Sequence, residues 1–131
     1  MNFSVKKEII LPAIQSVIGA IERKQTLPIL SNLLVQVSGH TITITATDLE
    51  IELKNTIVME DEFECFDFTV PARKMADICK SFEDGSTINF SISHEHVVIT
   101  CQRSRFTLSI LPGSDYPKIE KTNHIYGFNI Q

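Results

Sequence analysis

The chain has 131 residues, the length of a single domain, with 12 Lys and Arg residues against 16 Asp and Glu residues. Its 43% of hydrophobic residues is typical of a globular protein, and no run of about 18 apolar residues is present that could cross a membrane. Taken alone, the formal net charge of -4 argues against a protein that binds nucleic acid, because such proteins usually carry a basic surface.

Strand patterns dominate the chain. In residues 41–47 four threonines alternate with Ile42, Ile44 and Ala46, and Ser38-Gly39-His40 predicts the hairpin turn before this segment. We expect about eight mostly antiparallel strands, over residues 2–5, 32–37, 41–47, 49–59, 66–70, 87–92, 97–102 and 105–111.

Two segments follow the helical period instead. Between Glu8 and Ile21 apolar residues recur at helical spacing, and Pro12 requires a start near Glu8 or Ile9. Pro71 suits the first position of a second helix, which extends to Phe82. The apolar face of that helix comprises Ala72, Met75, Ala76, Cys79 and Phe82, and its polar face comprises Arg73, Asp77 and Lys80.

Together these elements predict an α+β domain, in which one antiparallel sheet carries two amphipathic helices on one face. Residues 118–127 are polar and typical of a linker. Residues 128–131 then begin a new apolar alternation that stops at once. We therefore expect the chain to be a piece of a longer protein.

No pattern assembles a convincing catalytic site. Asp48 and Glu50 could be a carboxylate pair for a hydrolase, but we expect them with Glu52 on the polar face of a strand. His94 and His96 could bind a metal, yet no third ligand is obvious and the pair lies in a predicted turn. Residues 60–67 hold five acids and no base, which is typical of a solvated loop.

The three cysteines, Cys65, Cys79 and Cys101, are widely spaced and match neither a disulfide framework nor a zinc motif. This usage suits a reducing cytosol, so we predict a cytoplasmic protein. We expect no metal site, no cofactor and no catalytic residue.

The distribution of charge is more informative than its total. Residues 6–24 carry four basic and two acidic residues, and residues 71–80 carry three basic residues and one acidic residue. The two helical segments with their flanks therefore total +4, and the rest of the chain totals -8. The basic residues could be ordinary solvated helix faces, or they could form one surface that attracts the phosphates of a duplex.

Arg103, Arg105 and Phe106 begin a strand near the end of the chain, where a strand can lie at a sheet edge. A bare edge pairs with another chain unless it is protected, and Arg with Phe suits a protein interface. The alternative is an internal strand with exposed arginines, and the residues alone leave both open.

Five short patterns run through the chain: Thr26-Leu27-Pro28-Ile29-Leu30 with Asn32-Leu33-Leu34, Thr47-Asp48-Leu49-Glu50, Val70-Pro71-Ala72-Arg73-Lys74, Arg103-Ser104-Arg105-Phe106, and Leu111-Pro112 with Asp115-Tyr116-Pro117. Each is weak alone. In this order and spacing they resemble the first domain of the bacterial DNA polymerase III beta subunits, the sliding clamps. By this resemblance residues 1–125 are a first clamp domain, and residues 126–131 begin a truncated second domain.

The resemblance implies a function without catalysis. In that family three similar domains make one chain, and two chains close head to tail into a ring whose hole is lined by helices. Duplex DNA passes through the hole, and the ring tethers the polymerase. The implied function is that of a processivity factor for bacterial chromosomal replication, whose partners are double-stranded DNA, bound through its backbone, and a second clamp chain.

Matching positions imply the residues that meet DNA. Lys24 and Arg73 fall where the family places DNA-facing basic residues, although an arginine is expected in place of Lys24, so a bidentate contact to phosphate is lost. Arg23 is adjacent and could compensate. Lys7 and Lys80 are also expected to face the pore.

Matching positions also imply a ring interface between the first domain of one chain and the third domain of the other. The residues that match it are Arg103, Arg105, Phe106 and Leu108 on the edge strand and Lys74 and Ile78 on the second helix. The family's pocket for polymerase and clamp loader lies in later domains, so we expect it to be absent here. A small α+β protein-interaction module without a nucleic-acid role is the alternative.

Overall fold

The structure is a computed structural model that describes residues 1–21 and 28–117. This part of the chain contains two α-helices and seven strands. In chain order they are β1 (Asn2–Lys6), α1 (Lys7–Ile18), β2 (Asn32–Thr47), β3 (Glu52–Pro71), α2 (Ala72–Ser81), β4 (Thr87–Ile92), β5 (His96–Cys101), β6 (Ser104–Ser109) and β7 (Leu111–Pro112). Two short 3-10 turns, η1 (Pro28–Ser31) and η2 (Gly113–Asp115), complete the list.

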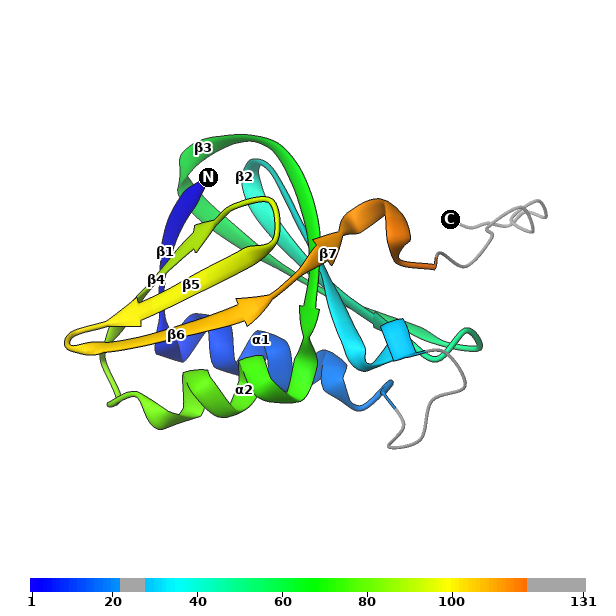
Figure 1. Cartoon of the computed structure of the whole chain (residues 1–131), viewed down its shortest axis with the longest axis horizontal. Helices are drawn as coiled ribbons and strands as arrows, with labels where there is room; N and C mark the ends of the chain where they lie inside the picture. The colour runs from blue at the N-terminus through cyan, green and yellow to red at the C-terminus, as the bar shows by residue number, and fades with distance from the viewer. Residues whose placement is uncertain (22–27, 118–131) are drawn as a thin grey trace.

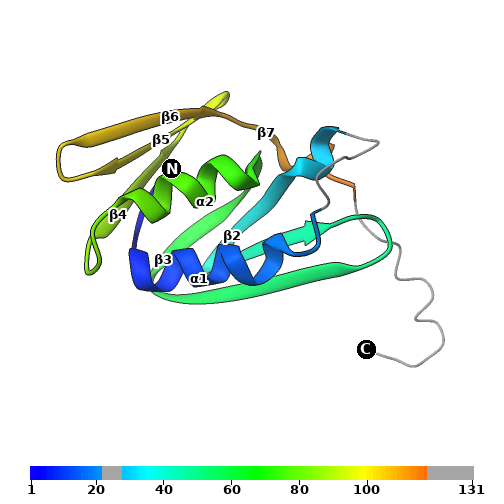
Figure 2. The same ribbon diagram turned by 90° about the horizontal axis from the view of Figure 1, so that it is seen from below.

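The strands form two antiparallel sheets rather than the single sheet that we expected. One sheet has the order β1-β4-β5-β6, and the other has the order β2-β3-β7. Both helices lie side by side along one side of the molecule, with the sheets above them (Figures 1 and 2). The α+β class is therefore confirmed. Within residues 1–21 and 28–117, β6 pairs with β5 alone and therefore lies at the edge of its sheet.

The described residues form seven strands where about eight were expected, and one difference is that Gly39 does not form a hairpin turn. The chain passes through Gly39 as a single long strand, β2, with register shifts on both sides of that residue. Gly39 has a φ of 57°, a left-handed conformation that suits glycine at a bulge. The turn that reverses the chain instead lies between Thr47 and Glu52.

The acidic stretch at residues 60–67 is also different from the prediction. Its five acids are exposed, as expected of solvated side chains, but the backbone continues as the middle of β3 rather than as a loop. This continuation joins the two strands expected at 49–59 and 66–70 into one. Figure 1 shows the resulting β2–β3 ribbon bending around one end of the molecule.

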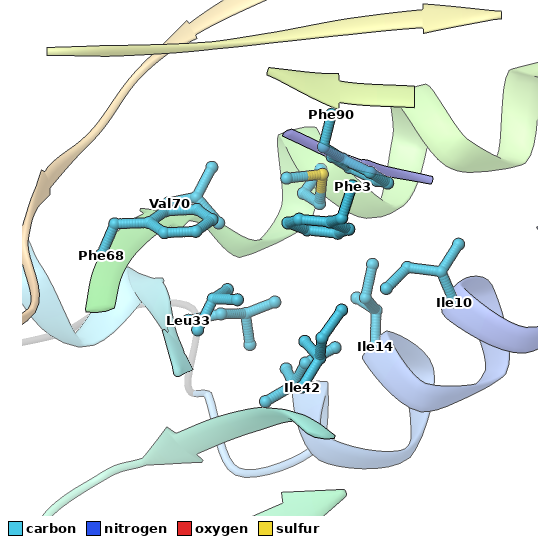
Figure 3. A pocket seen from close by; sticks show the side chains of 11 residues that line it. Phe3, Ile10, Ile14, Leu33, Ile42, Phe68, Val70 and Phe90 are labelled. Carbon is cyan, nitrogen blue, oxygen red and sulfur yellow. The ribbon is translucent and has the colours of Figure 1, made fainter. Parts of the chain in front are cut away.

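Apolar side chains from both sheets and both helices fill the core. Phe3 of β1 stacks on Phe90 of β4 with ring centroids 4.9 Å apart, and Ile10 and Ile14 of α1 point into the same space (Figure 3). A cavity of about 20 Å³ remains there, lined by apolar side chains. Since water needs polar partners to occupy such a space, this cavity is a packing defect rather than a ligand site.

Candidate nucleic-acid interface

The exposed side of α2 is basic. Ala72, Met75, Ala76 and Cys79 are buried against the core, as predicted from their spacing. The exposed residues of the helix include Arg73, Lys74, Asp77 and Lys80, three cations against one anion. Figure 2 looks directly onto this side of α2, with α1 beside it. A phosphate backbone that approached the helices would therefore meet net positive charge on α2.

Arg73 connects the beginning of α2 to the end of α1. Its Nη2 donates a hydrogen bond to the main-chain oxygen of Ile21 at 3.4 Å. A guanidinium group carries five N–H donors, so this single bond leaves most of them for other acceptors. The contact places Arg73 on the exposed surface between the two helices, where it could bind phosphate without losing its anchor.

Lys7, expected to face the pore, directs its ammonium group to partners within the domain. Its side chain is 11% exposed, and its ammonium group donates to the main-chain oxygens of Lys80 at 3.3 Å and Phe82 at 2.5 Å. It also pairs with the carboxylate of Asp84 at 3.2 Å. These oxygens are at the negative C-terminal end of α2, so Lys7 caps that helix. The ammonium group has little capacity left for a phosphate.

The surface of α1 contributes little positive charge. Apart from Lys7, its charged residue is Glu8, whose carboxylate accepts a hydrogen bond from the main-chain N–H of Gly85. The net +2 of residues 6–24 therefore depends on Lys6 and on residues 22–24. Arg23 and Lys24, both predicted to contact DNA, lie outside the described residues.

The edge strand β6 combines exposed arginines with half-buried apolar side chains. Arg103, in the turn before β6, and Arg105, within it, are exposed. Phe106 packs edge-to-face on Phe82 with ring centroids 5.8 Å apart, and Leu108 is also half-buried. On α2, Lys74 is exposed and Ile78 half-buried. In the part of the chain that the structure describes, this edge has no strand partner, and its residues have the composition of an interface.

The carboxylate pair considered for hydrolysis lies in a turn, so its predicted place on a strand face is wrong. The carboxylate of Asp48 accepts hydrogen bonds from the main-chain N–H groups of Glu50 and Ile51, both at 2.9 Å. These bonds lower the pKa of Asp48. A carboxylate that is already hydrogen-bonded and easily ionised is a poor general acid or base near neutral pH, so this turn gives no support to a hydrolase.

The exposure of apolar side chains at this turn was not predicted from the sequence. It placed Leu49 and Ile51 on the apolar side of a strand, yet their side chains are 45% and 50% exposed. The signal was Asp48 itself, because Asp commonly begins a turn by accepting bonds from N–H groups further along the chain. A second missed contact involves Tyr116, whose buried hydroxyl oxygen accepts a hydrogen bond from the N–H of Thr47 at 3.0 Å.

Residues 1–21 and 28–117 contain no cluster of three or more side chains that could hold a metal ion. His94 and His96 are exposed in the β4–β5 turn region, and Cys65, Cys79 and Cys101 are free thiols. Neither described helix is long and apolar enough to cross a membrane.

Comparison with known proteins identifies the family. The family model of the DNA polymerase III beta subunit N-terminal domain matches residues 1–120. The chain belongs to this family. It is 43% identical over 130 residues to a beta sliding clamp from Pseudomonas aeruginosa, covering 99% of this chain and 35% of that protein. It is 40% identical over 120 residues to the clamp from Escherichia coli, covering 92% of this chain and 33% of that protein.

Solved clamp structures have the same fold. A DNA polymerase III subunit beta from Pseudomonas aeruginosa, bound to griselimycin, superposes with a TM-score of 0.86 at 45% identity, over 92% of this chain and 32% of that one. A Caulobacter crescentus clamp superposes with a TM-score of 0.82 at 30% identity, over 92% of this chain and 32% of that one. The described fold is therefore that of the clamp N-terminal domain, and the chain spans about a third of the length of these relatives.

Proposed function

We propose that this chain is the first domain of a sliding clamp, a ring that encircles duplex DNA and tethers DNA polymerase III during bacterial chromosomal replication. Membership of the clamp family over residues 1–120 carries the proposal. In this proposal the domain has no catalytic role and works in the cytoplasm. It extends to about residue 125, and a second domain begins at residue 126.

DNA contacts come from the helix side of the domain. Arg73 and Lys80 supply exposed cations on α2, and Arg23 and Lys24, which follow α1 in the sequence, add to them in this proposal. Such cations attract phosphates irrespective of base sequence, so the ring stays mobile along the duplex. Topological closure supplies the residence time, and strong binding is unnecessary. Lys7 supports this surface indirectly, by capping α2.

The free edge of β6 closes the ring in this proposal. Arg103, Arg105, Phe106 and Leu108 meet the last domain of a second clamp chain, with Lys74 and Ile78 beside them, and two chains join head to tail. Aromatic residues and arginines are enriched at protein interfaces relative to the rest of the surface. Polymerase and clamp loader bind domains beyond this chain.

The test is primer extension with the full-length protein, its clamp loader and its polymerase on a primed circular template. The clamp should lengthen the products of each binding event while incorporating no nucleotide itself. Product length that does not change on addition of the clamp would contradict the proposal and favour a protein-interaction module without a nucleic-acid role.

A further inference from the structure

Asp84 and Gly85 form the sharp turn between α2 and β4. They are the single Asp-Gly or Asn-Gly pair in the 131 residues. The main-chain N–H of Ser86 donates to the oxygen of Glu83 at 3.2 Å, and Gly85 has a φ of 85°, as in the third position of a type II turn. The turn lies beside the beginning of α1 in both views (Figures 1 and 2).

An aspartate that is followed by glycine can rearrange without an enzyme. The main-chain nitrogen of the glycine attacks the side-chain carboxyl carbon of the aspartate. A C–N bond forms, the nitrogen loses its proton, and one carboxyl oxygen leaves in a molecule of water, which produces a five-membered succinimide ring. Water then opens the ring. Opening at the main-chain carbonyl leaves the peptide link on the side chain, as an isoaspartate, so the sum of the two steps is an isomerisation.

The surroundings of the pair leave room for both steps. The side chain of Asp84 is 92% exposed, so water reaches it freely. Gly85 has no Cβ to obstruct its own nitrogen, and even an added Cβ would meet no other atom within 4 Å. Composition and exposure therefore both favour the reaction at this turn.

Two residues at the beginning of α1 hold the groups that would react. The ammonium group of Lys7 pairs with the carboxylate of Asp84 at 3.2 Å, and the carboxylate of Glu8 accepts a hydrogen bond from the Gly85 N–H. The main-chain N–H of Lys7 also donates to the oxygen of Ser86 at 2.9 Å. Ring closure consumes the proton of Gly85 and the negative charge of Asp84, so both side-chain contacts must break before the ring is complete. The folded turn therefore resists a reaction that its sequence favours.

We propose that Asp84-Gly85 is a site of spontaneous isoaspartate formation, and that Lys7 and Glu8 set its rate by keeping the turn closed. The product has an additional carbon in its main chain and carries its free carboxylate on Cα, so the geometry of both contacts is lost. Because the ammonium group of Lys7 also caps α2, the rearrangement loosens the end of that helix against α1. The proposal holds whether or not the domain belongs to a clamp.

Peptide mapping after prolonged incubation of the protein measures the reaction, because an isoaspartyl peptide has the mass of its parent but a different chromatographic retention. Conversion at Asp84 should be slower in the folded protein than in a peptide of residues 80–88. Glu8→Ala should accelerate it roughly fivefold, since the loss of one hydrogen bond raises the population of the open turn by about that factor. Lys7→Met should accelerate it as well. Glu8→Gln keeps an acceptor oxygen and should fall between Glu8→Ala and the parent.

Ile92→Val is the matched control, because Ile92 is buried at the end of β4 away from the turn. It destabilises the core without altering the turn and should leave the conversion at the rate of the parent. Equal acceleration by Ile92→Val and Glu8→Ala would overturn the proposal, because global unfolding would then set the rate. Slower conversion in Glu8→Ala would overturn it too, since Glu8 would then act as a base for the attack. Conversion as fast in the parent as in the peptide would show that the turn gives no protection.

Discussion

The ammonium group of Lys7, the first residue of α1, donates to the main-chain oxygen of Phe82, directly after α2, at 2.5 Å. One side chain thereby joins the beginning of one helix to the end of the other. This contact holds α2, which carries Arg73 and Lys80 of the proposed DNA surface, beside α1, although Lys7 faces the protein rather than the solvent.

Replacing Lys7 with Met should therefore destabilise the domain. The substitution keeps most of the aliphatic stem but leaves the oxygens of Lys80 and Phe82 without their donor. We expect a loss of about 1–2 kcal/mol in the free energy of unfolding, measured by urea denaturation. Lys6→Met is the matched control, because Lys6 is exposed on β1, and its effect should stay within about 0.5 kcal/mol.

The hydrogen bonds to Asp48 make the stability of the domain depend on pH. Main-chain N–H groups hold the pKa of Asp48 below 3.8 in the folded state, so its stabilising contribution is present above the unfolded pKa and is lost as the pH falls through the folded one. Asp48→Asn should be less stable than the parent at pH 7, and the difference should shrink below about pH 3.9. Urea midpoints across this range measure it. A gap that persists at low pH would contradict the account.

Basic residues of the helix side should control retention on DNA. Lys24→Ala with Arg73→Ala should impair loading or shorten the lifetime of full-length rings on nicked circular DNA, because phosphate attraction is lost. Lys54→Ala, which removes one positive charge, is the control for each of these two substitutions made singly. Asn55 donates to Ser16 of α1, so its neighbour Lys54 points away from the helices. Equal effects of both changes would argue against a localised DNA surface.

The β6 edge should set the strength of ring closure. Phe106→Ala is expected to weaken dimerisation of the full-length protein, although it also removes the contact with Phe82. Arg105→Glu separates the two effects, since Arg105 is exposed and the fold does not need it. Sedimentation at nanomolar concentration should show monomers for both variants. Ser91→Glu, on the exposed face of the internal strand β4, should remain dimeric.

Regular periodicity made most elements predictable. The apolar spacing in 8–21 and 71–82 located both helices to within a few residues, and alternation located the strands of the first sheet. Features that depend on distant contacts were not predictable. Ser38-Gly39-His40 has the composition of a turn, but the pairing of β2 with β3 makes Gly39 the site of a bulge. Lys7 was expected to face the pore, because its partners Phe82 and Asp84 lie 75 and more residues away in the sequence.

Release from DNA ends distinguishes a ring closed around duplex DNA from a protein that binds the surface of the duplex. Full-length protein is loaded onto nicked circular DNA, the DNA is linearised at one site, and bound protein is measured by gel filtration before and after the cut. We predict stable retention on the circle and loss from the linear ends. Equal retention on circular and linear DNA would contradict the account, because it would show that binding does not depend on encirclement.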